Sequence, residues 1–231
     1  DGKWNRNRSF FTKEKTNNYQ SCKTCGANRL IMANEMTTLV RVKNANDDVV
    51  KRVTEIFTPE SGSYDVSSIE LLNRVYGTNY SYEADKEDWD REKDWPSTEE
   101  WQSKMGPKWS YGEEFYMEEG DTEGSFIIRS AWSVPQVLLE SIAKELYTIK
   151  EDCYIVGNYE DEGYEPVGAF IYAKDYDDIE DLDHAYDVED LWDDDELRDK
   201  MYDEIIKLEN ELESCYFEYV QDKIDNPEDY Q

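Results

Sequence analysis

Residues 125–173, SFIIRSAWSVPQVLLESIAKELYTIKEDCYIVGNYEDEGYEPVGAFIYA, alternate between strand and helix patterns. The apolar run 125–130 predicts a strand, and Pro135 stands where a proline commonly opens a helix. Apolar residues then recur at helical spacing, at Val137, Leu138, Ile142 and Leu146. Two more strands are predicted over 152–157 and 168–173, with a tight turn between them. This succession predicts an α+β domain with an antiparallel sheet.

The preceding residues extend the same pattern. A β-branched run at 37–43 predicts a strand, and Asn46 then provides an N-cap for a helix. The apolar stripe of that helix is Val49, Val50, Val53, Ile56 and Phe57. A second short helix is predicted over 66–76. The order strand, helix, strand, helix, strand, strand suits a ferredoxin-like arrangement, in which helices cover one face of the sheet. The other face is then open for a partner or for the remaining segments.

An aromatic-rich insertion is predicted at about 58–124. Over 80–124 the periodicity fades, while Trp89, Trp95, Trp101 and Trp109 recur among charges. Because a structureless loop of that length is improbable in a compact domain, we expect short elements of its own there. These tryptophans and Trp132 could stack sugars or bases, but we interpret most of them as packing residues, since the surrounding negative charge opposes binding of single-stranded nucleic acid.

The charge of the chain changes sign at Met32. The formal net charge is −31 at pH 7, yet residues 1–31 carry seven basic and two acidic residues. We therefore predict a basic extended arm over 1–31, a ferredoxin-like domain over 32–173 and an acidic segment over 174–231. Such a field disfavours direct binding of nucleic acid or an anionic membrane and favours basic protein surfaces.

The acidic segment 174–231 contains 24 acidic and five basic residues. Two similar runs, 176–182 and 186–191, are interpreted as a local duplication of acidic and aromatic turns. A helix is predicted over about 195–224, with a heptad stripe at Met201, Ile205, Leu208, Leu212, Cys215 and Tyr219. We expect its outer face to approach the linear charge density of DNA. The stripe needs cover, and the open face of the sheet is the nearest surface.

The sequence offers little for catalysis. Cys22 and Cys25 have zinc-knuckle spacing, but a structural zinc site needs four ligands. The other possible metal ligands, Cys153, Cys215 and His184, lie in or near predicted elements whose packing explains them. The remaining metal hypothesis is that Cys22 and Cys25 form half of an intermolecular site. His184 has no nucleophile motif with it, and the dense carboxylates form a surface run rather than a cleft. We therefore predict no enzymatic activity and no cofactor.

Several motifs together resemble a known family. They are Met32-Ala-Asn before strand 37–43, Trp101 with Lys108-Trp109, the run Ser130-Ala-Trp-Ser-Val-Pro135, and Tyr159-Glu-Asp-Glu-Gly163 followed by Val167-Gly-Ala-Phe. Over 32–173 the chain resembles the YubB-like, Api-type ferredoxin-like proteins of bacteriophages, plasmids and insect-symbiont phage genomes. The resemblance implies a ferredoxin-like fold, an origin on a mobile element and a small non-enzymatic accessory protein. It implies no activity, because the family has none established.

The function predicted from these features is binding to a basic surface of a nucleic-acid-binding or defence protein, with carboxylates standing where phosphates would stand. The predicted contact residues are Asp177, Asp178, Glu180, Asp181, Asp187, Glu189, Asp190, Asp193, Asp194, Asp195, Glu209, Glu211 and Glu213, with Tyr176, Tyr186 and Trp192 as anchors. The alternative is a structural component of a virion or other assembly that inserts the basic arm into a neighbouring subunit. The expected location is the host cytoplasm or, for the alternative, the virion.

Overall fold

The computed structural model describes residues 34–59, 63–81, 90–183, 186 and 188–230. The predicted basic arm, with Cys22 and Cys25, lies outside the described residues, as do His184 and Asp187. The folded body of the protein begins at Ala33.

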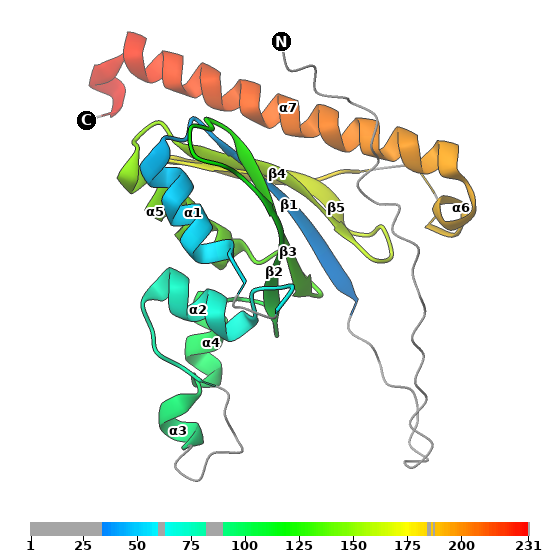
Figure 1. Ribbon diagram of the computed structural model, residues 1–231. Coiled ribbons are helices and arrows are strands. Elements are labelled where there is room, and N and C mark those ends of the chain that lie inside the picture. The colour runs from blue at the N-terminus through cyan, green and yellow to red at the C-terminus, as the bar shows by residue number, and fades with distance from the viewer. Residues whose placement is uncertain (1–33, 60–62, 82–89, 184–185, 187, 231) are drawn as a thin grey trace. The chain divides into compact units, whose positions relative to one another are not determined.

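A six-stranded antiparallel sheet forms the centre of the body (Figure 1). Its order is β2-β3-β1-β4-β5-β6. The strands are β1 Glu35–Lys43, β2 Ser110–Tyr116, β3 Gly124–Ala131, β4 Tyr154–Asp161, β5 Val167–Ala173 and β6 Tyr176–Asp181. The predicted α+β class and antiparallel sheet are confirmed.

The prediction missed two strands, β2 and β6, and both lie at the edges of the sheet. Strand β2 lies inside the predicted insertion, and β6 falls where acidic and aromatic turns were predicted. Edge strands have one neighbour and more exposed side chains, so their sequences need not show the apolar runs of central strands. The sequence YDDIED of β6 therefore lacks a strand signal, although it pairs with β5 along its whole length.

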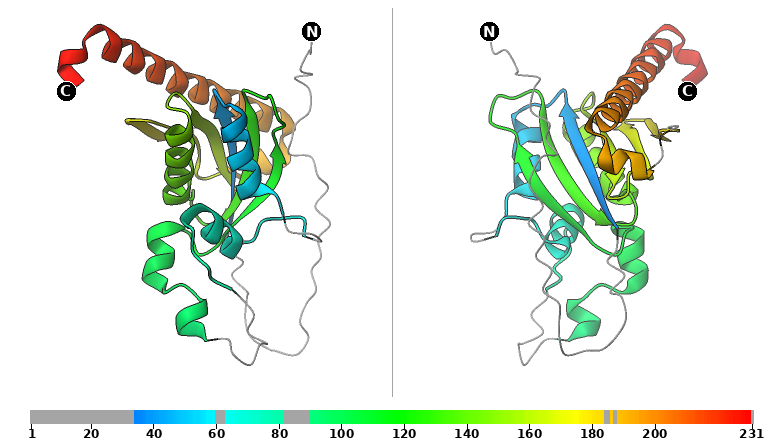
Figure 2. Two further views of the ribbon diagram at one scale, coloured as in Figure 1. Left: turned by 60° about the vertical axis from the view of Figure 1, so that its left-hand side comes forward. Right: turned by 90° about the vertical axis from the view of Figure 1, so that its right-hand side faces the viewer.

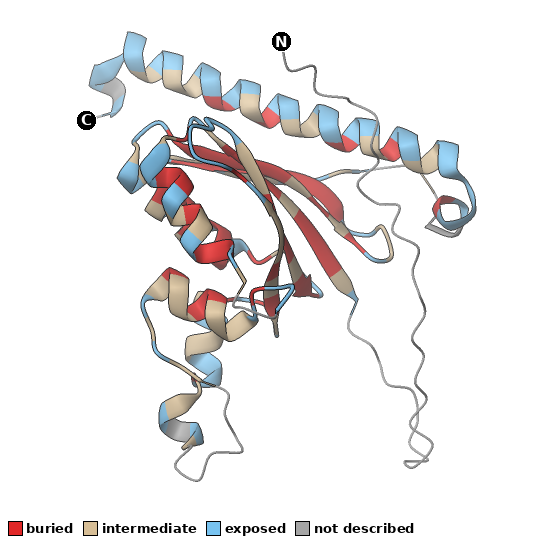
Figure 3. Cartoon of the chain, viewed as in Figure 1, coloured by how far each residue is buried: buried red, intermediate tan, exposed pale blue. Residues whose placement is uncertain are grey.

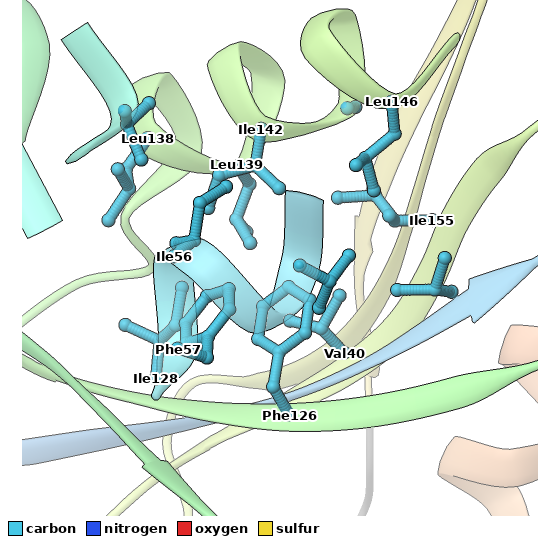
Figure 4. Close-up of a cluster of buried hydrophobic side chains, with 14 of the residues drawn as sticks. Val40, Ile56, Phe57, Phe126, Ile128, Leu138, Leu139, Ile142, Leu146 and Ile155 are labelled. Carbon is cyan, nitrogen blue, oxygen red and sulfur yellow. The ribbon is translucent and has the colours of Figure 1, made fainter. Parts of the chain in front are cut away.

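Two helices with strong apolar faces pack on one face of the sheet (Figure 2). They are α1 Asp47–Phe57 and α5 Gln136–Ile149, with α2 Ser68–Tyr76 beside them. The side chain of Asn46 caps α1 by accepting from the Val49 amide at 3.0 Å, as predicted. Figure 4 shows the core between these helices and the sheet, where Phe57 and Phe126 stack with ring centroids 3.9 Å apart.

The long helix α7, Asp195–Asp225, crosses the opposite face of the sheet over β4 and β5. Its buried Leu212 and Tyr216 pack against Val156, Ala169 and Ile171. The alternate residues of β5, including Phe170, enter the core beneath α5. Every residue of β5 is therefore buried, because it has a helix on each face. Figure 3 shows buried residues along the side of α7 that faces the sheet.

The heptad stripe predicted for α7 is wrong at one position. Cys215 is exposed, whereas Tyr216 is buried. The inward stripe is Met201, Ile205, Leu208, Leu212, Tyr216 and Tyr219, and Leu197, Tyr202 and Val220 pack beside it. Its successive spacings are 4, 3, 4, 4 and 3 residues, which break the strict alternation of 4 and 3 that a heptad repeat requires. Leu212, Tyr216 and Tyr219 pack with strands β4, β5 and β6 of the chain's own sheet.

The aromatic-rich insertion has short elements, as predicted. It contains α3 Arg91–Asp94, α4 Thr98–Lys104 and strand β2. Trp95 and Trp101 stack in parallel with ring centroids 6.1 Å apart, and the Trp101 indole donates to the Pro107 carbonyl at 2.7 Å. These tryptophans serve packing, whereas Trp89 is not among the residues described.

The C-terminal part closes with two short elements, α6 Val188–Asp193 before α7 and η1 Pro227–Tyr230 after it. Within the described ranges, no helix combines the length and apolar character needed to span a membrane.

Candidate functional site

The predicted contact residues gather on three neighbouring elements, β6, α6 and α7. On β6, Asp177, Glu180 and Asp181 are exposed and Asp178 is half-buried. On α6 and at the start of α7, Asp190, Asp193, Asp194 and Asp195 are exposed, and so is Glu211 further along. Successive residues of a strand point to opposite sides of the sheet, so Asp178 and Glu180 lie on the side of α7, whereas Asp177 and Asp181 lie on the side of α5. We call the exposed carboxylates of Glu180, α6, Asp194 and α7 the acidic face. Glu189 lies on α6, but its side chain is outside the described set.

Two of the predicted contact residues point toward the sheet instead. The Glu209 carboxylate accepts hydrogen bonds from Arg41 on β1 and from the Asn158 amide at 2.8 Å. Glu213 accepts from the Tyr154 hydroxyl at 2.6 Å. Both lie on the inward flank of α7, so they hold the helix to the sheet and are not available to a partner. The helical positions of both residues were predicted, but which strands lie beneath them was not.

The three predicted aromatic anchors differ in their exposure. Tyr176 packs against Tyr216 and Tyr219, with ring centroids 5.5 and 5.1 Å away, so it belongs to the α7 interface. Tyr186 is half-buried, and its hydroxyl donates to Glu204 at 3.1 Å. Trp192 is 49% exposed and meets the edge of Tyr164. Trp192 is therefore the most exposed of the three.

Much of the acidic face has no basic partner in the described part of the chain. Its ion pairs are Asp195 with Arg198, Glu196 with Lys200 and Glu211 with Lys207. No such pair involves Asp190, Asp193, Asp199, Asp203 or Glu218, all of which are exposed. These carboxylates are therefore open to a partner.

The expected charge density of α7 was too high. Eleven of its 31 residues are acidic, and Glu209 and Glu213 face inward. A helix of this length spans about 46 Å, which leaves one outward carboxylate per about 5 Å, against one phosphate per about 1.7 Å of duplex DNA. The helix alone therefore reaches about a third of the duplex density, and β6 and α6 must contribute to any imitation of DNA.

The outer edge of β6 is protected against strand pairing. The Asp178 carboxylate accepts from the amide of Ile179 at 2.9 Å, and four of the six residues of this strand are acidic. Charges on an edge strand discourage the addition of another strand. A partner would therefore meet the side chains of β6 and not its backbone.

A cleft of about 430 Å³ lies beside β6, on the side of the sheet that carries α5. It is lined by Gly106, Pro107, Trp132, Ser133, Val134, Gln136, Val137, Tyr159, Pro166, Ile179 and Asp181. Residues of the motifs at 130–135 and 159–163, far apart in sequence, meet here. The sequence singled out these motifs but gave no sign that they share a cleft.

Comparisons with protein-family models, with curated proteins and with solved structures found no match to this chain. What the protein does must therefore be inferred from its own residues.

The described cysteines do not form a site. Cys153 is buried, and this burial raises the pKa of its thiol to about 12, whereas Cys215 is exposed on α7. Among the described residues, no cluster of three or more His, Cys, Asp or Glu side chains could hold a metal ion. The proposed half-site of Cys22 and Cys25 lies outside this part of the chain and stays a prediction.

Proposed function

We propose that this chain is a non-enzymatic acidic protein that binds a basic surface of another protein. The observation that carries the proposal is the acidic face, where many exposed carboxylates of β6, α6 and the outer side of α7 have no basic partner among the described residues. With a net charge of −31, the chain attracts basic surfaces at long range and repels nucleic acid.

The partner surface that suits this face best is one that normally holds DNA or RNA. Such surfaces carry rows of Lys and Arg, and carboxylates can occupy the positions of the phosphates. Charge alone gives weak, salt-sensitive contacts, so a stable complex also needs desolvated anchors. The half-exposed Trp192 beside the acidic run of α6 supplies one.

We also propose a ferredoxin-like core and an origin on a mobile element. Support for the core comes from the order β1, α1, β2, β3, α5, β4, which follows the βαββαβ succession once the three helices α2, α3 and α4 between α1 and β2 are counted as inserted, with β5 and β6 extending the sheet. The motif resemblance to YubB-like, Api-type proteins supports the origin. A phage protein of this kind would act on a host DNA-binding or defence protein.

The proposal is tested by neutralising part of the acidic face. One variant replaces Asp190, Asp193, Asp199, Asp203 and Glu218 by their amides. The control replaces five exposed acidic residues elsewhere, Asp48, Glu99, Glu118, Glu119 and Glu140, and so has the same net charge. Each is added to a basic DNA-binding protein holding a labelled duplex, and release of the DNA is followed by fluorescence anisotropy. We expect the unaltered chain and the control to compete at lower concentration than the first variant. Equal competition by both variants would show that only net charge matters.

The structural alternative rests on the opposite charges of residues 1–31 and the remainder of the chain. Arm and body are complementary between copies, which favours assembly. A chain beginning at Met32 separates the two functions. If the acidic face acts on a basic partner, the shortened chain competes as well as the full chain. If the arm joins subunits, light scattering shows self-association of the full chain that the shortened chain loses.

A further inference from the structure

The cleft beside Trp132 has two features that suit a cationic side chain, an exposed aromatic ring and a carboxylate. Trp132 lies in the turn between β3 and α5, and Asp181 ends β6. We propose that this cleft binds the guanidinium group of an arginine side chain on a basic partner. The inference rests on the proposed function and adds to it a specific residue type.

The turn that carries Trp132 holds the ring in an exposed position. The backbone of Trp132 has a φ of 65°, which is uncommon for a bulky residue and costs conformational energy. The Trp132 amide donates to the Asn34 carbonyl at 3.0 Å, and the Ser130 hydroxyl donates to the Ser133 carbonyl at 2.8 Å. These bonds fix the turn, and the indole remains 51% exposed. A large aromatic side chain kept exposed on a strained backbone is typical of a binding site.

The indole already attracts a cation. The Nζ atom of Lys108 lies 5.5 Å from the centroid of the Trp132 ring. Lys108 is itself exposed, so its ammonium group is free to exchange with solvent. Arginine stacks on aromatic rings more readily than lysine, because its guanidinium is planar and more weakly hydrated.

The carboxylate of Asp181 is held in place at the cleft. The Tyr159 hydroxyl donates to its Oδ1 atom at 2.5 Å, and Tyr159 is only 2% exposed. Burial raises the pKa of Tyr159, so its hydroxyl keeps the proton that orients Asp181. The second oxygen of the carboxylate accepts no other hydrogen bond from the described residues. It can accept one from an entering guanidinium.

The remaining walls are largely apolar, from Pro107, Val134, Val137, Pro166 and Ile179. Such walls suit the methylene stem of an arginine and weaken the competition of water for the ion pair. The first turn of α5 also borders the cleft and contributes a partial positive charge. That charge is smaller than the full charge of Asp181, and the neighbouring acidic residues of β6 further favour a cation.

The test compares two labelled peptides of equal charge, acetyl-(Gly-Arg)₃-amide and acetyl-(Gly-Lys)₃-amide, by fluorescence anisotropy at 150 mM salt. We expect the full chain to bind the arginine peptide about tenfold more tightly. Asp181→Asn keeps an acceptor for Tyr159 and removes the charge, and Trp132→Ala removes the ring. Both variants should lose the preference for arginine and bind the two peptides equally. Glu119→Gln, exposed in the turn between β2 and β3 and outside both the cleft and the acidic face, is the control and should keep the preference.

Three outcomes would overturn the inference. The first is equal binding of both peptides by the unaltered chain. The second is a preference for the arginine peptide that survives Asp181→Asn. The third is displacement of the arginine peptide by 10 mM inorganic phosphate but not by chloride at the same ionic strength. The last would make the cleft an anion site. In each case the proposed function stands if both peptides bind in a salt-sensitive way, and it fails if neither peptide binds.

Discussion

Replacing Glu209 by glutamine should loosen the attachment of α7 to the sheet. The side chain of Glu209 is 12% exposed and that of Arg41 is 31% exposed, so their ion pair is partly shielded from water. Glu209 also accepts a hydrogen bond from the side-chain amide of Asn158 at 2.8 Å. Glu209 therefore links α7 to both β1 and β4. The variant Glu209→Gln keeps the size of the side chain and removes the charge.

The expected loss in the free energy of unfolding follows from these contacts. A hydrogen bond to a charged group contributes about 1.5–3 kcal/mol, and breaking a fully buried pair costs about 3–5 kcal/mol. Exposed pairs contribute about 0–1 kcal/mol. Because Arg41 is nearly a third exposed and glutamine can still accept one bond, we expect a loss of about 2 kcal/mol.

The matched control is Glu211→Gln, two residues along the same helix. Glu211 is 58% exposed and, among the described residues, pairs with Lys207 alone, so its replacement should change stability by less than about 0.5 kcal/mol. Both variants remove one negative charge, so the effect on overall repulsion is the same. Urea unfolding followed by far-ultraviolet circular dichroism measures the difference. Equal midpoints for the two variants would refute the assignment of Glu209 to the helix–sheet contact, and so would an unchanged loss when Arg41 is already Gln.

Three further predictions concern pH, thiol reactivity and packing. Burial raises the pKa of Asp161 and Glu145 in the folded state, so between the usual and the raised pKa the folded chain binds more protons than the unfolded one. These two groups should therefore contribute more stability as the pH falls toward their usual pKa values, 3.8 and 4.5. Added salt should also raise stability, since it screens the repulsion within a chain of net charge −31. A melting temperature that falls as the pH approaches 4.5 would contradict the first expectation. In a chain with Cys22→Ser and Cys25→Ser, an aromatic disulfide reagent should modify Cys215 at once and Cys153 only after unfolding, as mass spectrometry would show. Gly157→Ala would place a Cβ atom 2.0 Å from the Leu39 carbonyl oxygen, so we expect a loss of about 2 kcal/mol or more, and an unchanged melting temperature would argue against this close approach of β1 and β4.

Local signals were sufficient for the elements that bury apolar residues. The cap at Asn46, the stripe of α1 and the strand patterns of β1, β3, β4 and β5 are properties of short segments, and the structure contains each of them. The charge division at Met32 and the acidic character of 174–231 are properties of composition alone.

Only the tertiary structure decided what depends on neighbours distant in sequence. Strands β2 and β6 are stabilised by pairing with β3 and β5, and their polar sequences give no local strand signal. Tyr216 lies inward instead of Cys215 because it packs against Tyr154 and Tyr176 of the sheet, which a heptad count on one helix cannot show. Glu209 and Glu213 became structural residues because Arg41, Asn158 and Tyr154 lie beneath them. Trp132 and Asp181 likewise meet at one cleft because α5 packs on the sheet in which β6 is an edge strand. A sequence specifies the spacing of residues along a helix or strand, but not which distant element will lie beside them.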